Sequence, residues 1–217
     1  DEAKDQSYFL ARLTPEQLAN ARFPLGAFTK TDTRRMAAEA GLQPLVEKES
    51  QDICFIHEGA YSDFLKDQPG FCATPGPVVD SAGNLLGTHQ GLHRHTVGQR
   101  RGLGIPGPKP YYVVRLEPQA NRLVVGTKDA LYRRRCQVEK INWIVPPPPE
   151  PLEVAVRIRY RHQATPARLM PTADHGADII FSAPQAAITP GQGAVFYAGE
   201  IVLGGGWICA DTPDGSS

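Results

Sequence analysis

The pattern of apolar and polar positions changes once along the chain, near residue 50, and residues 1–45 read as helical. Thr14-Pro15-Glu16-Gln17 places an N-cap residue, a proline and an acidic side chain in the order that begins a helix. A second helix is predicted from Thr31 or Asp32 to Ala40, with Gly41 as its C-cap. This helix is short, so we expect it to pack on something larger.

Strand patterns predominate after residue 50. Residues 80–84, Asp-Ser-Ala-Gly-Asn, form a turn signal between the apolar runs 77–79 and 85–87, which predicts a hairpin. A second pair of strands is predicted at 111–116 and 122–126. These elements predict a small β-rich central domain.

The last third of the chain predicts a closed β-barrel. Four prolines at 146–149 form a stiff connector. Residues 152–160 then alternate, with Leu152, Val154, Val156 and Ile158 on one face. Short apolar strands separated by glycine and proline turns follow at 179–181, 194–197 and 201–203. The predicted class is α+β but mainly β: a short helical N-terminal segment, a central domain and a C-terminal β-barrel.

The composition of the 217 residues excludes a global basic field, because 23 basic and 23 acidic side chains balance. Any RNA binding must therefore come from local basic patches. No apolar run approaches the ~20 residues that span a bilayer, and the polar start lacks a signal peptide. We expect a cytoplasmic protein without a membrane partner. Because the chain starts without methionine, we also expect it to begin inside a longer protein.

The cysteines are scattered, and neither a CxxC pair nor zinc-ligand spacing occurs, so free thiols in a reducing cytoplasm are expected. Cys54 lies where a charged stretch meets an apolar run. A reactive thiolate needs a lowered pKa, which Lys48 favours and Glu49 and Asp52 oppose. A small cysteine buried in a strand is the alternative. The cysteines are Cys54, Cys72, Cys136 and Cys209.

Arginine side chains gather in two places. Residues 91–105 combine Arg94, Arg100 and Arg101 with glycines in a spacing that matches neither the dinucleotide fingerprint nor the P-loop. This segment suits an RNA backbone, or it is a turn with solvated arginines. Arginines also occupy alternate positions of the strand predicted at 152–160 and beyond it, which places them on one face, towards phosphate or solvent. These are Arg157, Arg159 and Arg161.

Four segments in this order resemble those of the tRNA-specific 2-thiouridylases, and the resemblance runs from about Lys4 to Gly206. This family converts the C2 oxygen of the wobble uridine in certain tRNAs to sulfur. A sulfurtransferase is therefore the implied enzyme class. The segments are 4–10, 48–56, 91–105 and 189–197, the last followed by Leu203-Gly204-Gly205-Gly206.

The resemblance implies specific site residues. Cys54 matches the cysteine that receives sulfur as a persulfide. Gln192, which on its own reads as a turn residue or a base-reading amide, matches a tRNA-contacting position. The other residues that match tRNA-contacting positions are Lys4, Asp5, Gln6, Arg159 and Tyr160. The chain departs from the family at His57, where glycine is usual, and at the short Pro106-Gly107-Pro108.

The resemblance also implies how the chain is divided. Residues 1–57 match the trailing segment of an ATP-dependent catalytic domain, 58–134 a central domain and 135–211 the barrel, with a disordered tail at 212–217. The family's phosphate-binding loop and its first catalytic cysteine are not in this sequence. ATP is therefore expected as a co-substrate of the complete enzyme, and this chain alone is expected to be inactive.

The implied reaction adenylates the uridine C2 oxygen, and a persulfide on Cys54 then supplies sulfur, directly or as released hydrosulfide. The first catalytic cysteine would close a disulfide with Cys54. No metal is implied, and the expected partners are tRNA and a sulfur-donor protein, either a cysteine desulfurase or a relay protein. Two alternatives remain: a stand-alone tRNA-binding module without chemistry, and a structural barrel without an RNA partner.

Overall fold

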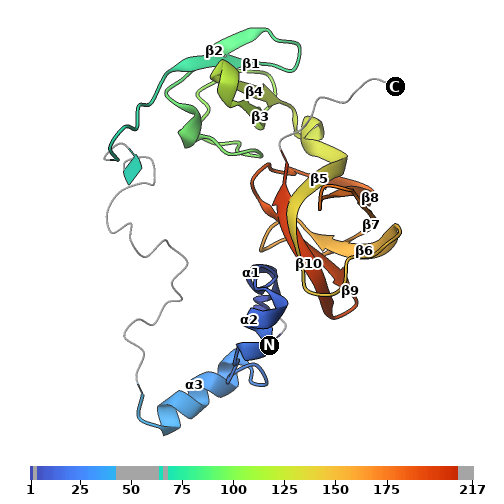
Figure 1. Ribbon diagram of the computed structural model, residues 1–217. Coiled ribbons are helices and arrows are strands. Elements are labelled where there is room, and N and C mark those ends of the chain that lie inside the picture. Colours follow the sequence, from blue (N-terminus) through green and yellow to red (C-terminus); the bar gives the residue numbers. More distant parts are fainter. Residues whose placement is uncertain (2–3, 43–63, 66–67, 210–217) are drawn as a thin grey trace. The chain divides into compact units, whose positions relative to one another are not determined.

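The computed structural model describes residues 1, 4–42, 64–65 and 68–209. Three helices lie at its N-terminal end: α1 (Ser7–Leu10), α2 (Pro15–Asn20) and α3 (Lys30–Glu39) (Figure 1). The remainder is a small sheet domain and a closed barrel, so the predicted class, mainly β with a short helical start, is confirmed. The chain divides into two compact units, of which the barrel unit comprises Asp1–Glu49, Arg134–Ala183 and Pro190–Ser217.

Helices α2 and α3 each begin at a reciprocal cap. Thr14 accepts a hydrogen bond from the Gln17 amide, which confirms the predicted cap of α2, and the Gln17 side chain accepts one from the Thr14 amide, which was not predicted. The predicted start of α3 at Thr31 or Asp32 is wrong. Thr29 is the N-cap, because Asp32 at the third helical position completes the reciprocal pair with it.

Helix α3 does not bury any residue in the part of the chain that the structure describes. The apolar side chains of this helix and of the loop before it are exposed, and the packing partner expected for α3 is not among the described residues. Apolar side chains gathered in this way usually mark a contact surface. The exposed side chains are Phe23, Leu25, Phe28 and Met36.

The central unit is a four-stranded sheet in the order β2-β1-β4-β3, in which β1 and β4 run parallel and the two other pairs run antiparallel. The predicted hairpin is confirmed: Asp80 accepts hydrogen bonds from the amides of Ala82 and Asn84 and closes its turn. Val78, Val113, Leu123 and Val125 form the core. The strands are β1 (Gly76–Val79), β2 (Leu85–His89), β3 (Tyr112–Glu117) and β4 (Arg122–Gly126).

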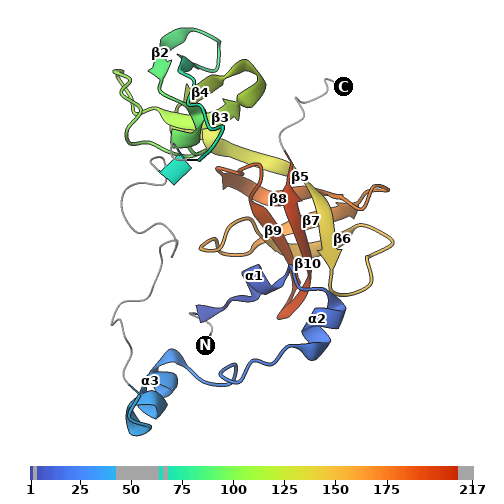
Figure 2. The same ribbon diagram turned by 60° about the vertical axis from the view of Figure 1, so that its left-hand side comes forward.

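The C-terminal barrel closes in the order β10-β5-β8-β7-β6-β9, which confirms the predicted closed barrel (Figure 2). Two of its strands were not expected, β5 and β7. An arginine run near the start of β5 and two prolines within β7 conceal the alternation that marks a strand. The strands are β5 (Tyr132–Trp143), β6 (Leu152–Arg157), β7 (Thr165–Pro171), β8 (Ala177–Ala186), β9 (Gly193–Ala198) and β10 (Ile201–Ile208).

Strand β9 is buried on both of its faces. Ala194 and Phe196 share one face, and Phe196 pairs with the buried Val156 of β6. Val195 and Tyr197 lie on the opposite face and are buried as well, at 3% and 8% exposure. A continuous apolar run is the pattern expected of a strand covered on both sides. Something outside the barrel must therefore cover the outer face of β9.

The pairing of β5 with β10 is interrupted by an extra residue on β5. Gly205 pairs with Asn142 and Trp207 with Glu139, so three steps on β5 face two on β10. Lys140, in this bulge, adopts the left-handed backbone conformation with φ of 50°. The bulge turns backbone groups of β5 away from the ladder and leaves them available for other contacts.

Gly206 of β10 has no room for a side chain. A Cβ atom there would lie 2.5 Å from the Glu139 carbonyl oxygen and 2.7 Å from Cγ1 of Val138. We predict that Gly206→Ala lowers the free energy of unfolding by about 1–3 kcal/mol, measured by urea denaturation. Gly87→Ala is the matched control, because only one atom, 4.0 Å away, lies near its Cβ position. Equal stability losses in the two variants would contradict this account of the β5–β10 contact.

Candidate functional site: an N-terminal segment docked on the barrel

The outer face of β9 is covered by the segment from Lys4 to Leu13, which contains α1. Ala11 of this segment is fully buried and packs in one apolar cluster with Val195 and Tyr197. Tyr8 packs against the same cluster, and its hydroxyl donates a 3.0 Å hydrogen bond to the Gly193 carbonyl. Figures 1 and 2 show α1 against the barrel beside β10. We call this segment the docked segment.

A charged pair fixes the start of the docked segment to β6. Arg157 donates through Nη1 to Oδ2 of Asp5 at 3.0 Å. The Ser7 hydroxyl donates to the same Asp5 oxygen at 2.9 Å and lies 3.1 Å from the hydroxyl of Tyr197. The Arg157 guanidinium also lies 5.5 Å from the centre of the Tyr197 ring, a cation–π contact. These four side chains, from the docked segment, β6 and β9, form the polar clamp.

The polar clamp changes the titration of Asp5. Burial raises the pKa of its carboxyl group, but hydrogen bonds from the Ser7 amide, the Ser7 hydroxyl and Arg157 outweigh burial and hold that pKa below its ordinary value. Burial raises the pKa of the Tyr197 hydroxyl. The carboxylate of Asp5 is therefore ionised, and Tyr197 neutral, at neutral pH.

The end of the docked segment is held by the bulged strand β5. The side-chain amide of Asn142 donates to the carbonyls of Ala11 and Leu13, at 2.9 and 2.8 Å. Arg12 donates to the carbonyl of Lys140, the bulge residue, at 3.0 Å. The two bonds from Asn142 satisfy carbonyls at the end of the docked segment, where a helix of one turn leaves them without partners. The bulge thus has a clear role, because it presents Lys140 to Arg12.

The structure brings most of the predicted tRNA-contacting residues to the docked segment and its surroundings. Lys4 and Gln6 are exposed within it, and Gln6 does not use its side chain to cap α1. The ring of Tyr160 lies 4.7 Å from that of Phe9. Gln192 is exposed at the start of β9 and lines a groove together with Tyr8 and Phe9. Asp5 belongs to the polar clamp, and whether it also contacts tRNA stays a prediction.

The predicted row of three arginines along one strand is wrong. Strand β6 ends at Arg157, and the chain bends at residues 158–160. Arg157 turns to Asp5 in the polar clamp, whereas Arg159 and Arg161 are exposed beyond the strand end. Arg157 is therefore separated from the other two, and Arg159 and Arg161 flank Tyr160, whose ring packs against Phe9.

The glycine-rich segment 91–105 covers the sheet of the central unit. Leu92, Leu103 and Ile105 pack against its core. The side chain of Gln99 accepts from the Thr96 amide and donates to the Arg101 carbonyl, so it holds the loop together. The arginines of this segment remain exposed, which is compatible with either interpretation of the sequence. They are Arg94, Arg100 and Arg101.

Cys54 lies outside the described residues, as does the rest of the segment 51–56. The described cysteines carry free thiols, with Cys136 buried and Cys72 exposed. Burial, and then the nearby Glu139 and other carboxylates, raise the pKa of the Cys209 thiol. Among the described residues, groups of His, Cys, Asp or Glu side chains that could hold a metal ion do not occur. Helices long and apolar enough to cross a membrane are likewise absent from the described part.

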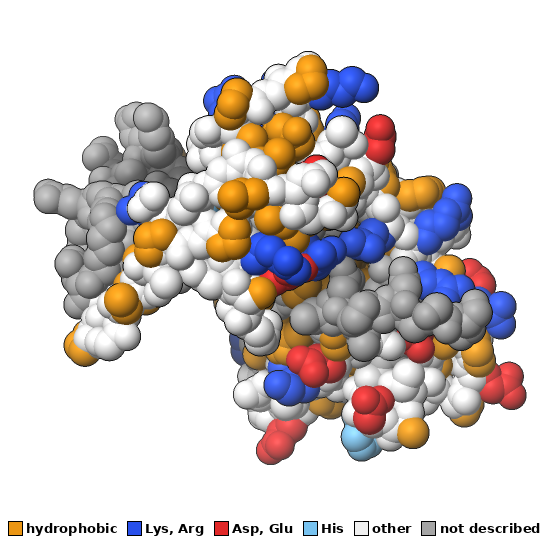
Figure 3. All heavy atoms as spheres, turned by 90° about the horizontal axis from the view of Figure 1, so that it is seen from above, with side chains coloured by type: hydrophobic (Ala, Val, Ile, Leu, Met, Phe, Trp, Pro, Cys, Tyr) orange, Lys and Arg blue, Asp and Glu red, His pale blue; other side chains and the backbone are white. Residues whose placement is uncertain are grey.

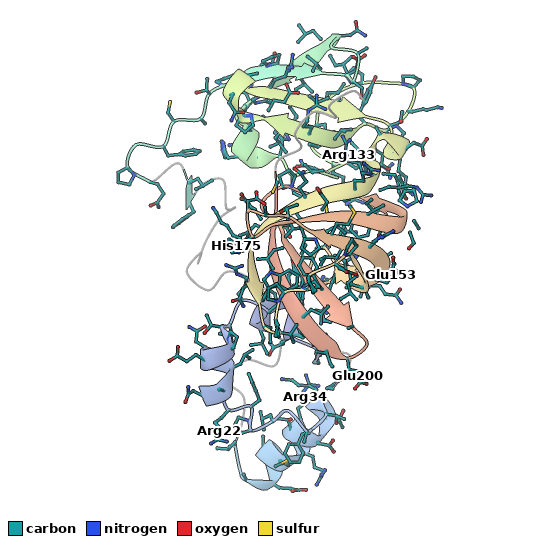
Figure 4. The ribbon with its side chains drawn as sticks, turned by 45° about the vertical axis from the view of Figure 1, so that its right-hand side comes forward. Arg22, Arg34, Arg133, Glu153, His175 and Glu200 are labelled. Atoms are coloured by element: carbon teal, nitrogen blue, oxygen red, sulfur yellow. The ribbon has the colours of Figure 1, made fainter. Side chains whose placement is uncertain are left out.

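Charged side chains of both signs are interspersed on the face shown in Figure 3, in keeping with the zero net charge. Glu153 lies on the outer side of β6 and Glu200 in the turn between β9 and β10 (Figure 4). Any local preference for RNA must therefore come from particular groups of residues rather than from overall charge.

Sequence reasoning missed the residues that hold the docked segment in place. Arg12 and Asn142 were not singled out, and Ser7 and Tyr197 lie in the segments 4–10 and 189–197 without a predicted role, although each makes a contact between distant parts of the chain. One signal was present: the apolar run 194–197 lacks alternation, which indicates a strand covered on both faces. The identity of the covering segment had no local signal.

We predict that Asp5→Asn lowers the free energy of unfolding of the chain by about 1–2 kcal/mol, because Arg157 loses a charged partner in a partly exposed position. Chymotrypsin cleavage after Phe9 should become faster as the docked segment is released. Glu153→Gln is the control, since Glu153 is exposed on the outer side of β6. Unchanged stability and cleavage in Asp5→Asn would show that the polar clamp does not hold the segment.

The same variant has a defined pH dependence. Because the folded pKa of Asp5 lies below the unfolded value, the clamp contributes its full stability above the unfolded pKa of about 3.9 and loses it as pH falls through the folded pKa. The stability difference between the natural chain and Asp5→Asn should therefore be constant near neutral pH and shrink in acid. A difference that grows in acid would contradict the assignment.

Comparison with known protein families identifies three consecutive matches. The tRNA methyl transferase HUP domain matches residues 1–58, and the tRNA methyl transferase PRC-barrel domain matches residues 62–127. The aminomethyltransferase beta-barrel domain matches residues 133–208. The docked segment thus belongs to the first match and the barrel that holds it to the third.

Similar proteins give the same grouping. The chain is 49% identical over 209 residues to the tRNA-specific 2-thiouridylase MnmA of Magnetococcus marinus, covering 96% of the chain and 58% of that protein. It is 47% identical to that of Geotalea uraniireducens (96% and 56%) and 49% identical to that of Desulfosudis oleivorans (97% and 59%). The chain thus spans somewhat over half the length of these relatives. It belongs to the tRNA-specific 2-thiouridylase family.

Proposed function

We propose that this chain is part of a sulfurtransferase that replaces the C2 oxygen of a tRNA wobble uridine with sulfur. The observation that carries the proposal is the 47–49% identity to relatives named tRNA-specific 2-thiouridylase over nearly the whole chain. In this proposal the described residues supply a tRNA-binding surface, and Cys54 supplies the sulfur. ATP is a co-substrate of the complete enzyme, and the reaction takes place in the cytoplasm.

The surface around the docked segment is suited to tRNA. Lys4 and Arg159 supply positive charge for phosphates, and Gln6 and Gln192 supply amides that both donate and accept hydrogen bonds. Phe9 and Tyr160 are 57% and 37% exposed, so their rings are accessible to unpaired bases. These residues come from sequence positions up to 188 apart, between Lys4 and Gln192, and the polar clamp brings them together.

Cys54 is the proposed carrier of the persulfide sulfur. Cys136 is buried at 8% exposure, and Cys209 has a raised pKa, so each is poorly suited to form a reactive thiolate. Cys72 is exposed and free, which makes it the natural control. The sulfur reaches Cys54 from a donor protein that carries a persulfide, either a cysteine desulfurase or a relay protein.

The transfer has two possible orders. In the first, the terminal persulfide sulfur on Cys54 bonds to C2 and the activated C2 oxygen leaves. A second thiol then attacks the Cys54 sulfur, releases the thiolated uridine and closes a disulfide. In the second order, that thiol first attacks the Cys54 sulfur, closes the disulfide and releases hydrosulfide, which then bonds to C2 as the activated oxygen leaves with its adenylate. Both orders split one difficult substitution into easier steps. Both require an unpaired wobble uridine that is turned out of its stack.

Activation of the C2 oxygen is assigned to residues outside this chain. The glycine spacings here do not match a phosphate-binding fingerprint, so the residues present do not fit ATP. The exposed Phe23, Leu25, Phe28 and Met36 favour a further contact of residues 1–57 with the rest of a catalytic domain. This chain alone is therefore proposed not to thiolate tRNA.

The central test is Cys54→Ser in the protein that carries this chain together with its ATP-binding domain. We predict loss of 2-thiouridine formation by more than about a hundredfold, because oxygen cannot carry a persulfide. The measurement is mass spectrometry of nucleosides from tRNA treated with ATP and a sulfur donor. Cys72→Ser should retain activity. Intact thiolation in Cys54→Ser would overturn the proposed sulfur carrier and favour a tRNA-binding module without chemistry.

The tRNA surface is tested with this chain itself in a gel-shift titration. We predict that Arg159→Ala weakens tRNA binding at every salt concentration and reduces the salt slope by about one. Arg168→Ala is the control, since Arg168 is exposed on β7 and lies opposite Glu153 of β6 rather than opposite a residue of the docked segment. Absence of tRNA binding by the unchanged chain would favour the structural barrel without an RNA partner.

A further inference from the structure

A groove lies on the outer surface of the barrel between the docked segment and β10. Tyr8, Phe9 and Arg12 of the docked segment line it together with Trp207 of β10, and the Arg12 guanidinium lies over the Trp207 ring. The rest of the lining comes from β9, β10 and the turn before β9, where Gly193 pairs with Trp207. These residues are Gly191, Gly193, Val195, Gly205 and Gly206. A Cβ atom at Gly193 would lie 3.0 Å from the Tyr8 hydroxyl, so glycine at this position leaves room beside Tyr8.

The walls of the groove are aromatic and accessible. Trp207 is 39% exposed and Phe9 is 57% exposed, a high fraction for such large apolar side chains. The Arg12 guanidinium lies 5.2 Å from the centre of the Trp207 ring. Its Nη1 atom also donates to the Lys140 carbonyl, which fixes the guanidinium plane beside the indole. A flat, cationic and aromatic wall of this kind attracts the π-face of a nucleobase.

The rim of the groove offers hydrogen bonds to the edge of a planar ligand. Gln192 is exposed there, and its backbone carbonyl accepts from the Ile208 amide at 2.8 Å, next to Trp207 in sequence. This pairing leaves the side-chain amide of Gln192, with its donor and its acceptor, beside the groove. An amide of this kind discriminates between base edges. The groove therefore combines stacking, positive charge and an edge-reading group.

From this combination we propose that the groove binds one unpaired nucleobase of the tRNA, stacked against Phe9, Arg12 and Trp207 and bonded at its edge by Gln192. This inference rests on the proposed tRNA-binding function. The occupant is an RNA base rather than an apolar protein segment, because Arg12 and Gln192 match the polar edge and π-face of a base. Trp207 of the barrel and Arg12 of the docked segment thereby become substrate-binding residues.

The groove lies beside other residues that are predicted to contact tRNA. Phe9 lines it and also packs its ring 4.7 Å from Tyr160, in the loop that carries Arg159. A strand whose phosphates meet Lys4 and Arg159 thus has bases within reach of the groove. Base-paired RNA presents no free ring face to a wall of this kind, so the groove selects loops and unstacked nucleotides.

The test uses tryptophan emission, because the chain has two tryptophans, Trp143 and Trp207. The chain is titrated with an RNA hairpin that copies a tRNA anticodon arm, and with a blunt RNA duplex of equal length. Stacking on Trp207 should quench emission with the hairpin and not with the duplex. In the Trp207→Phe variant, quenching by the hairpin should disappear. The remaining emission comes from Trp143, whose ring centre lies 5.9 Å from that of the buried Phe196, and it reports that the barrel is folded.

Affinity is measured in parallel by gel shift with the hairpin. Trp207→Ala should weaken binding about tenfold, since stacking of one base contributes roughly 1–3 kcal/mol. Trp207→Phe should bind within about threefold of the natural chain, as it keeps a ring for stacking. Tyr132→Ala is the control, because Tyr132 is 44% exposed on the central-unit part of β5.

Each result has one interpretation. Hairpin-specific quenching together with the affinity loss in Trp207→Ala supports the nucleobase groove. Binding of the hairpin with unchanged affinity in Trp207→Ala and without quenching overturns the groove and leaves the proposed tRNA-binding function standing. Equal quenching by duplex and hairpin overturns the assignment to an unpaired base. Absence of any hairpin or tRNA binding in the gel shift overturns the tRNA-binding function itself, and the groove with it.

Discussion

The ion pair between Asp5 and Arg157 is the interaction on which the rest of the candidate site depends. It joins the docked segment to β6 across 152 positions of sequence, and Ser7 and Tyr197 complete its hydrogen bonding. The pair is partly exposed, so its contribution to stability is modest, about 1–2 kcal/mol. The ion pair matters because of where it lies. Ala11 packs on β9 and Asn142 holds the end of the docked segment. Together with these contacts, the ion pair determines where Lys4, Gln6 and Phe9 lie relative to the barrel.

The barrel makes this docking possible through two departures from a regular sheet. The bulge at Lys140 offers a carbonyl to Arg12, and β9 offers an apolar outer face to Ala11 and Tyr8. The same arrangement leaves the groove next to Trp207. The docking of the segment and the presence of the groove therefore both follow from the same arrangement of β9 and β10. A side chain at Gly193 would press on the Tyr8 hydroxyl and disturb the docked segment.

The sequence predicted the elements whose signals are local. The cap at Thr14, the hairpin turn at residues 80–84 and the inward-facing Val154 and Val156 of β6 were predicted correctly, although β6 ends at Arg157 and Leu152 is exposed. The predictions from sequence failed where contacts between distant residues determine the position of a side chain. Arg157 was predicted to face solvent or phosphate together with Arg159 and Arg161. In the structure it forms an ion pair with Asp5, which is far away in sequence. The groove had no signal either, because Arg12, Gln192 and Trp207 meet only through strand pairing and docking. The family resemblance pointed to most of the exposed residues around it.

The most direct measurement is ultraviolet cross-linking of bound tRNA to the chain, followed by mass spectrometry of the linked peptides. The account predicts cross-links at Phe9, Tyr160 and Trp207, the aromatic side chains gathered at the docked segment, because photochemical linkage requires close contact between rings and bases. Tyr132, which is equally exposed at 44%, should remain unlinked. Cross-links at Tyr132 with none at the three predicted positions would contradict the central claim that the docked segment and barrel together form the tRNA-binding surface.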